Sequence, residues 1–206
     1  MKTIRFRILL ITVLICLLPI LLGVVWWERL PETMAIHFNF NGEPDHFAPK
    51  GFVVYGLPCL MGLFQAVACV AVDLQSKTRG EQKKVEWVSK WILPVITVVL
   101  YFVTLGYGLS WKIDIRMTAS LLVGGILLVT GNYLPKLDYV KHYQIDTAKA
   151  RKINRFLGYE TAIMGVLFLI SIFLPPIAAI VCLLLLIPYT VIGVIYGICV
   201  VKSGEN

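Results

Sequence analysis

Six long apolar stretches run through this chain, and they restrict it to folds that lie in a lipid bilayer. A helix needs about 20 mostly apolar residues to cross the hydrocarbon core, and unpaired backbone groups are costly in lipid, so each stretch is predicted to be helical. The runs are continuous, which excludes the alternating pattern of a β-barrel. The predicted fold is an all-α polytopic membrane protein with spans at Ile8–Trp27, Phe52–Val72, Trp91–Leu109, Met117–Leu134, Leu157–Leu174 and Ile177–Val201.

The composition agrees with this class. Of 206 residues, 58% are hydrophobic and 15% are charged, whereas a soluble domain usually has about 25% charged residues. The first stretch ends in Trp26 and Trp27 with no small-residue cleavage pattern, so we expect a retained span rather than a signal peptide. We divide the chain into a three-span half at 1–109, with an outer loop at 28–51, and a three-span half at 110–206, with a basic inner loop at 135–156.

The basic residues predict the orientation. Most of the 19 Lys and Arg lie in the N-terminal segment, the second and fourth loops and the C-terminal segment. The opposite set of loops holds only Arg29, Lys50, Lys112 and Arg116. The positive-inside rule therefore puts both termini in the cytoplasm. The formal charge of +7 is then explained by topology and anionic lipid, not by direct binding of nucleic acid.

The loop at 28–51 is long enough for structure of its own. Apolar Ile36, Phe38 and Phe40 alternate with polar residues, which predicts a short strand with one apolar face. Asn41 and Gly42 then form a strong turn signal, with Gly42 supplying positive φ. We predict a compact β-turn element on the outer membrane surface, with its Phe face toward lipid or helix ends.

Two interpretations of the polar residues in this loop stay open. His37 and His46 flank the turn with acidic residues between them, which fits a cation site or a pH-sensitive peptide site. The plainer interpretation is a loop in which Asp45 and Asn39 accept turn N–H groups and His37 bonds a backbone carbonyl. The spacing matches no helical metal motif, so no metal site and no cofactor is predicted. Lys50 is expected to pair with Asp45 or with lipid phosphate.

Few polar groups fall within the predicted spans. Glu160 lies near the start of the fifth span, which suggests an interface contact, a buried ion-pair partner or a proton-relay group. Gln65 is expected to bond another helix, and Lys90 to extend toward the cytoplasmic face. No span carries the acid and base pairs that a pump needs. Small residues at Gly193 and Gly197 permit close approach of a helix from this chain or from a second copy. A homo-oligomer is therefore one of the alternatives.

The basic inner loop is predicted to end in a helix. Asp146 or Thr147 can cap a helix that runs into the fifth span. Its basic residues are interleaved with apolar ones, which fits contact with anionic lipid or docking of a cytoplasmic protein. The hypothetical partner-binding residues are Asn132, Lys136, Lys149, Arg151, Lys152 and Arg155.

The outer loop resembles the N-terminal signature of the SdpI family of bacterial membrane proteins. The matching positions are Leu30, Pro31, Ile36, His37, Phe38, Asn39, Gly42, Pro44, Asp45 and Lys50. Residues 131–136 and 154–158 resemble two blocks of the family's C-terminal half, although Asn154 stands where the family usually has His. Residues 143–149 differ from the family's run between those blocks, so the second half is a divergent match.

The resemblance implies self-protection against a secreted membrane-active peptide. The mechanism we expect is capture of an amphipathic peptide at the outer loop and helix ends, which keeps it from inserting in the bilayer. It also implies a second role, in which the membrane protein holds a soluble transcriptional repressor at the bilayer. A small transporter is a third alternative. The hypothetical peptide-binding residues are His37, Phe38, Asn39, Phe40, Gly42, Pro44, Asp45 and Lys50.

Enzymatic activity is not expected. The sequence contains no nucleophile elbow, zinc-protease helix motif, phosphate-binding loop or dinucleotide-binding glycine pattern. The expected partners are lipid and, as the resemblance implies, a secreted peptide and a cytoplasmic repressor.

Overall fold

The computed structural model describes residues 4–39, 41–79, 83–136 and 147–202. Six helical segments within these ranges are long and apolar enough to cross a membrane, which confirms the predicted fold class. They run Phe6–Val25, Phe52–Leu74, Lys84–Gly108, Ile115–Lys136, Ala148–Phe173 and Ile177–Lys202. Large apolar side chains such as Phe173, Ile187 and Leu184 are exposed on their surfaces, as a lipid-facing helix requires.

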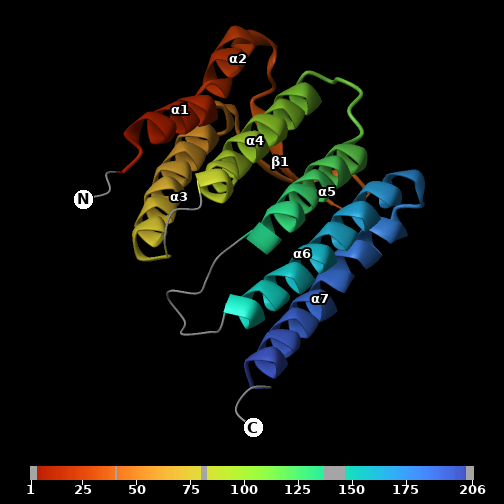
Figure 1. Cartoon of the computed structure of the whole chain (residues 1–206). Helices are drawn as coiled ribbons and strands as arrows, with labels where there is room; N and C mark the ends of the chain where they lie inside the picture. The colour runs from red at the N-terminus through yellow and green to blue at the C-terminus, as the bar shows by residue number, and fades with distance from the viewer. Residues whose placement is uncertain (1–3, 40, 80–82, 137–146, 203–206) are drawn as a thin grey trace. The chain divides into compact units, whose positions relative to one another are not determined.

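The chain divides into two compact units, the first formed by Met1–Gln75 and Glu86–Thr118. Its first span is two helices, α1 (Phe6–Leu17) and α2 (Pro19–Val25), because Pro19 lacks an N–H and ends the first helix. A short helical turn, η1 (Trp27–Arg29), leads to the strands β1 (Thr33–Phe38) and β2 (Pro44–Pro49). A π-helical turn, η2 (Phe52–Gly56), then continues into α3 (Leu57–Arg79), and α4 (Lys83–Gly108) follows (Figure 1).

The core of the first unit joins the strands to the helices. Leu30, Met34 and Ala48 from the hairpin region pack with Val53, Val54, Tyr101 and Leu105. Phe38 packs edge-on against Tyr107, with ring centroids 5.1 Å apart. The predicted Phe face toward helix ends is therefore present at Phe38, whereas Phe40 lies outside the described residues.

The second unit is formed by Ser76–Val85 and Ala119–Asn206. Its helices are α5 (Ile115–Tyr133, which begins in the first unit), α6 (Thr147–Ile170) and α7 (Ile177–Lys202), with short turns η3 (Leu134–Lys136) and η4 (Ser171–Phe173). A Cβ placed on Gly131 would lie 2.6 Å from the backbone nitrogen of Ala162 and 2.7 Å from the carbonyl oxygen of Gly158. The small residues Gly158 and Ala162 thus permit close packing between α5 and α6.

Two helices extend further than the apolar pattern indicates. The second and third spans were predicted to end at Val72 and to begin at Trp91, but α3 continues to Arg79 and α4 begins at Lys83. The expectation that Lys90 extends from the end of its span to water is therefore wrong. Lys90 is 2% exposed and pairs with Asp73. The longer helices therefore carry a paired acid and base, Asp73 and Lys90, which the predicted spans left out.

Glu160 also occupies a different place from the one expected. It was predicted to lie three residues inside a helix start, but α6 begins at Thr147, so Glu160 is in the middle of the helix. Its Oε2 is buried, without a hydrogen-bond partner among the described residues, and lies 3.5 Å from the position of a Cβ on Gly193 of α7. The dipole of a helix start consequently does not act on this carboxyl group.

Candidate functional site

The turn of the hairpin is fixed by one asparagine. Asn39 Oδ1 accepts hydrogen bonds from the backbone N–H groups of Asn41 at 2.9 Å and Glu43 at 3.0 Å, as the sequence predicted for this residue. The backbone N–H of Asn39 donates to the Glu43 carbonyl at 2.8 Å. Gly42 has φ 83°, which confirms its expected positive φ.

The strands pair antiparallel with two irregularities of register. Ala35 faces Phe47, His37 faces His46, and Phe38 faces Pro44. Ile36 is therefore an extra residue on β1, and Asp45 is an extra residue on β2. An extra residue of this kind bends a strand and re-aims its side chains. Met34 and Ala35 are both buried while Ile36 is 40% exposed, so the predicted apolar alternation fails at Ile36.

The bulge at Asp45 brings three polar side chains together, which we call the hairpin cluster (His37, Asp45 and His46). Asp45 Oδ1 accepts from His37 Nδ1 at 2.6 Å and from His46 Nδ1 at 3.2 Å. The imidazole rings lie edge-on with centroids 5.5 Å apart. The expectations that Asp45 would accept turn N–H groups and that His37 would bond a backbone carbonyl are wrong, because the two side chains bond each other. The alternative of an exposed cation or peptide site keeps its geometric basis.

The hairpin cluster predicts a pH dependence. Hydrogen bonds from His37 and then His46 lower the pKa of Asp45 below its ordinary value of 3.8. A carboxyl group with a lowered pKa in the folded chain stabilises the fold above its ordinary pKa, and this stabilisation is lost as pH falls through the lower folded value. The thermal midpoint of the wild-type chain should exceed that of Asp45→Asn at about pH 5, and the margin should shrink as the buffer is made more acidic. A margin that grows as the pH falls below about 5 contradicts this assignment.

Lys50 was expected to pair with Asp45, but its ammonium contacts the chain that leads into the hairpin instead. It is 8% exposed, and its Nζ lies 2.9 Å from Glu32 Oε1. The same ammonium donates to the carbonyl groups of Trp27 and Leu30 at 3.4 and 3.5 Å and lies 4.7 Å from the ring centroid of Trp27. Lys50 therefore fixes the chain between the first span and the hairpin, and its ammonium is buried and bonded within the chain.

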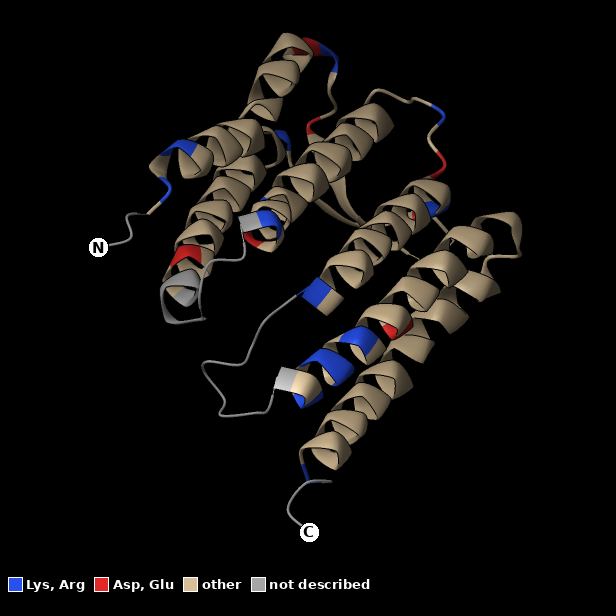
Figure 2. Cartoon of the chain, viewed as in Figure 1, with Lys and Arg blue, Asp and Glu red and all other residues tan. Residues whose placement is uncertain are grey.

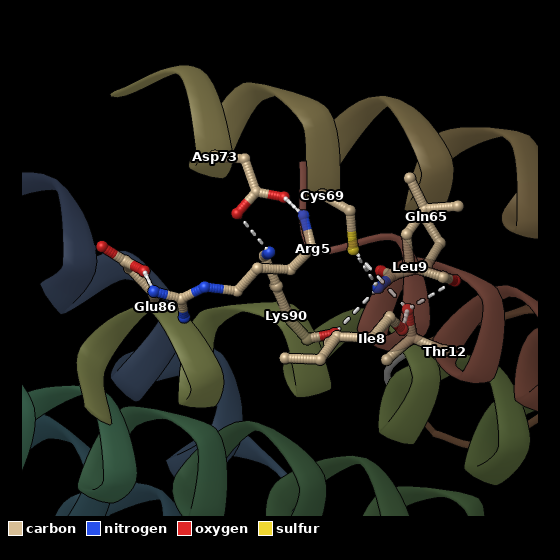
Figure 3. Close-up of polar contacts among 9 residues, drawn as sticks. All are labelled: Arg5, Ile8, Leu9, Thr12, Gln65, Cys69, Asp73, Glu86 and Lys90. Carbon is tan, nitrogen blue, oxygen red and sulfur yellow. Dashed lines mark hydrogen bonds and ion pairs between the residues drawn. The ribbon is translucent and has the colours of Figure 1, made fainter. Parts of the chain in front are cut away.

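A second set of polar contacts, drawn in Figure 3, lies near the start of α4, away from the hairpin. Lys90 Nζ lies 2.6 Å from Asp73 Oδ1, and the Arg5 guanidinium lies 2.9 Å from Glu86 Oε2. The backbone N–H of Arg5 donates to Asp73 Oδ2 at 3.1 Å. We call these four residues the buried charge network. The network connects α3 and α4 to Arg5, the residue just before α1. Lys90 and Tyr107, which packs under the hairpin, are 17 residues apart on α4, or about 25 Å at 1.5 Å per residue.

A row of polar side chains continues from this network into the helix bundle. Gln65 Nε2 donates to the Lys90 carbonyl at 2.8 Å, which confirms the predicted interhelical bond. It also donates to Cys69 Sγ at 3.1 Å, and Cys69 lies 3.5 Å from the hydroxyl of Thr12. Sequence reasoning missed Asp73 and Glu86, since both lie just outside the apolar windows. The available signal was Glu86 and Lys90 at i and i+4 on one helix face.

The basic residues predicted to bind a cytoplasmic partner belong to the second unit. α6 begins at Thr147, as the capping prediction required, and Figure 2 shows Lys and Arg gathered at that end of the helix. Arg151, Lys152 and Arg155 are exposed and line an open hollow with Tyr159 and Tyr196.

The other three predicted partner-binding residues do not line this hollow. Lys149 Nζ donates to the Val201 carbonyl at 2.8 Å, so it ties α6 to the end of α7. Lys136 lies over the ring of Tyr133, 4.4 Å from its centroid, and Asn132 is exposed on α5. The structure thus brings together three of the six predicted residues.

The comparison with protein families is local to the first unit. The profile of a domain of unknown function, DUF1648, matches residues 14–62. The matched region begins in α1, includes the whole hairpin with its cluster, and ends in the second turn of α3. No curated protein and no solved structure matches the chain.

Proposed function

We propose that the chain is a multi-pass protein of the bacterial plasma membrane with both termini in the cytoplasm and the hairpin outside. Support comes from the distribution of basic residues, since Arg151, Lys152 and Arg155 lie at the end of α6 that this orientation assigns to the cytoplasm. The opposite set of loops holds four of the 19 Lys and Arg, and one of these four, Lys50, is already paired with Glu32.

We propose further that the protein protects the cell by binding a secreted membrane-active peptide at the hairpin. The observation that carries this proposal is the mixed character of the exposed hairpin surface. Phe47 and Ile36 are 57% and 40% exposed, and the hairpin cluster is exposed beside them. A peptide that inserts in membranes has an apolar face and usually a cationic face. Its apolar face is complementary to the exposed Phe47 and Ile36 side chains, and its cationic face is complementary to the Asp45 carboxylate.

The mechanism follows from the rigidity of this surface. The Asn39 hydrogen bonds and the packing of Met34 and Phe38 hold the hairpin against the helix ends. A preformed surface loses little conformational entropy when a ligand binds. Capture at the membrane surface lowers the concentration of free peptide that can insert, which is the resistance that the family resemblance implies.

The experiment compares cells that lack the protein with cells that carry it, across a panel of membrane-active peptides. The deletion strain should show increased sensitivity to at least one peptide, and the wild-type gene should restore resistance. Asp45→Asn should restore much less, whereas Glu43→Gln, which removes the same charge two residues away, should restore resistance fully. Equal sensitivity of all strains to every peptide contradicts the proposal.

A second function is favoured by the basic hollow at the start of α6. Three cationic side chains beside Tyr159, Tyr196 and the stacked ring of Phe156 form a surface suited to an acidic segment of a soluble protein. This supports a role in holding a cytoplasmic regulator at the membrane. Reversing the charge of Arg151 and Lys152 should abolish co-purification of such a regulator, while the exposed Lys84→Glu should not. Unchanged recovery with the charge-reversed chain removes this alternative.

A further inference from the structure

The hairpin cluster has the composition and spacing of a metal site. His37, Asp45 and His46 each offer one ligand atom, and these three atoms lie within 4.8 Å of one another. In a tetrahedral zinc site, neighbouring ligand atoms are about 3.3 Å apart, as bond lengths of about 2.0–2.1 Å require. The contacts of 2.6 and 3.2 Å from Asp45 to the two rings therefore need to change by less than about 1 Å to admit an ion.

We propose that His37, Asp45 and His46 bind one Zn²⁺ ion, through one nitrogen of each imidazole and one oxygen of the carboxylate. Water completes the coordination from the solvent side, where all three side chains are exposed. The proton on a ligating ring nitrogen moves to the other ring nitrogen or to solvent, so that each imidazole binds as the neutral form. Two cross-strand ligands and one bulge ligand then tie β1 to β2.

The ligand chemistry selects among metal ions. Two imidazoles and one carboxylate suit zinc and its neighbours in the first transition row. Calcium and magnesium prefer sites made of oxygen atoms alone. Copper(I) prefers thiolate and thioether ligands, and the five Cys of the chain lie in the helical spans rather than in the hairpin.

The hairpin places these ligands without a large rearrangement. His37 and His46 already face each other across the strand pair, and the bulge directs Asp45 between them. The turn that connects them is closed by Asn39 and Gly42. A helical ligand motif is therefore unnecessary, which is why spacing along the sequence did not indicate the site. This proposal does not depend on peptide binding, because it is tested with metal alone.

The test is a titration of the purified full-length chain, stripped of metal, with Zn²⁺ against a competing zinc-binding dye. The wild-type chain should bind one zinc ion, and Asp45→Asn and His46→Gln should each weaken binding at least tenfold. Two matched controls should leave the affinity unchanged. Glu43→Gln removes a carboxylate from the same hairpin, and His142→Gln removes the third histidine of the chain, which lies outside the described residues. Unfolding midpoints measured without metal show whether each variant is folded.

A second measurement uses the unaltered chain, so it does not depend on how any variant folds. Cobalt(II) in place of zinc should give the strong visible absorption of a low-coordinate site, and stoichiometric zinc should abolish it. The proposal is overturned if the wild-type chain binds zinc no more tightly than the His37→Gln/His46→Gln double variant. It is also overturned if cobalt gives only the weak spectrum of the hydrated ion. Either result leaves the peptide proposal standing, since that one is decided by cell sensitivity.

Discussion

Lys90→Met should destabilise the protein by about 3–5 kcal/mol, the usual loss when one member of a buried ion pair is removed. The Lys90 side chain is 0% exposed and that of Asp73 is 5% exposed. Without the ammonium, the Asp73 carboxylate keeps a hydrogen bond from the Arg5 backbone but has lost its neutralising charge. The free energy of unfolding, measured by denaturant titration in detergent micelles, should fall by this amount.

Two further variants separate the lost charge from lost packing. Lys84→Met, at an exposed position on the same helix, should change the unfolding free energy by no more than about 0.5 kcal/mol. Asp73→Asn combined with Lys90→Met should recover most of the loss, because Asn is neutral and still accepts the Arg5 N–H. If the double variant is as unstable as the single one, the uncompensated charge is not the cause.

Gly131→Ala should destabilise the second unit by about 1–3 kcal/mol, the range expected for overpacking. The added methyl group would lie 2.6 and 2.7 Å from backbone atoms of α6. Backbone atoms cannot rotate away as a flexible side chain can, so α5 and α6 must separate. The thermal midpoint of the purified chain should fall accordingly.

The matched control for this substitution lies on the same helix. A Cβ on Gly125 meets no atom within 4 Å, so Gly125→Ala adds the same methyl group into open space. It should leave the thermal midpoint unchanged or raise it slightly, since Ala favours helix more than Gly does. Equal losses in the two variants would mean that close backbone packing at Gly131 does not stabilise the helix pair.

The parts of the fold that could be predicted depend on strong local signals. The spans follow from apolar length, and the turn at Gly42 follows from residues that tolerate positive φ. Asn39 and Gln65 were assigned correctly because each makes a contact that its chemistry strongly favours. These inferences need no knowledge of how distant segments meet.

The parts that could not be predicted depend on contacts between distant segments. The bulges at Ile36 and Asp45 change the pairing of the two strands, so Ile36 is exposed although Phe38 still packs against a helix end as expected. Lys50 pairs with Glu32, 18 residues away, and Lys90 with Asp73, 17 residues away. A hydropathy window treats Asp73, Glu86 and Lys90 as the end of a span, because it does not show that their charges compensate one another inside the helix bundle.

Cysteine labelling in intact cells tests most directly whether the hairpin faces the exterior. Asn41 lies in the exposed turn, and Lys84 is exposed at the far end of α4. The wild-type chain serves as the blank, since its five Cys all lie in spans. Asn41→Cys should react with a membrane-impermeant maleimide added outside, and Lys84→Cys should react only after the cells are permeabilised. Reaction of Asn41→Cys with a permeant reagent alone, or reaction of Lys84→Cys from outside, would contradict the orientation on which the proposed function depends.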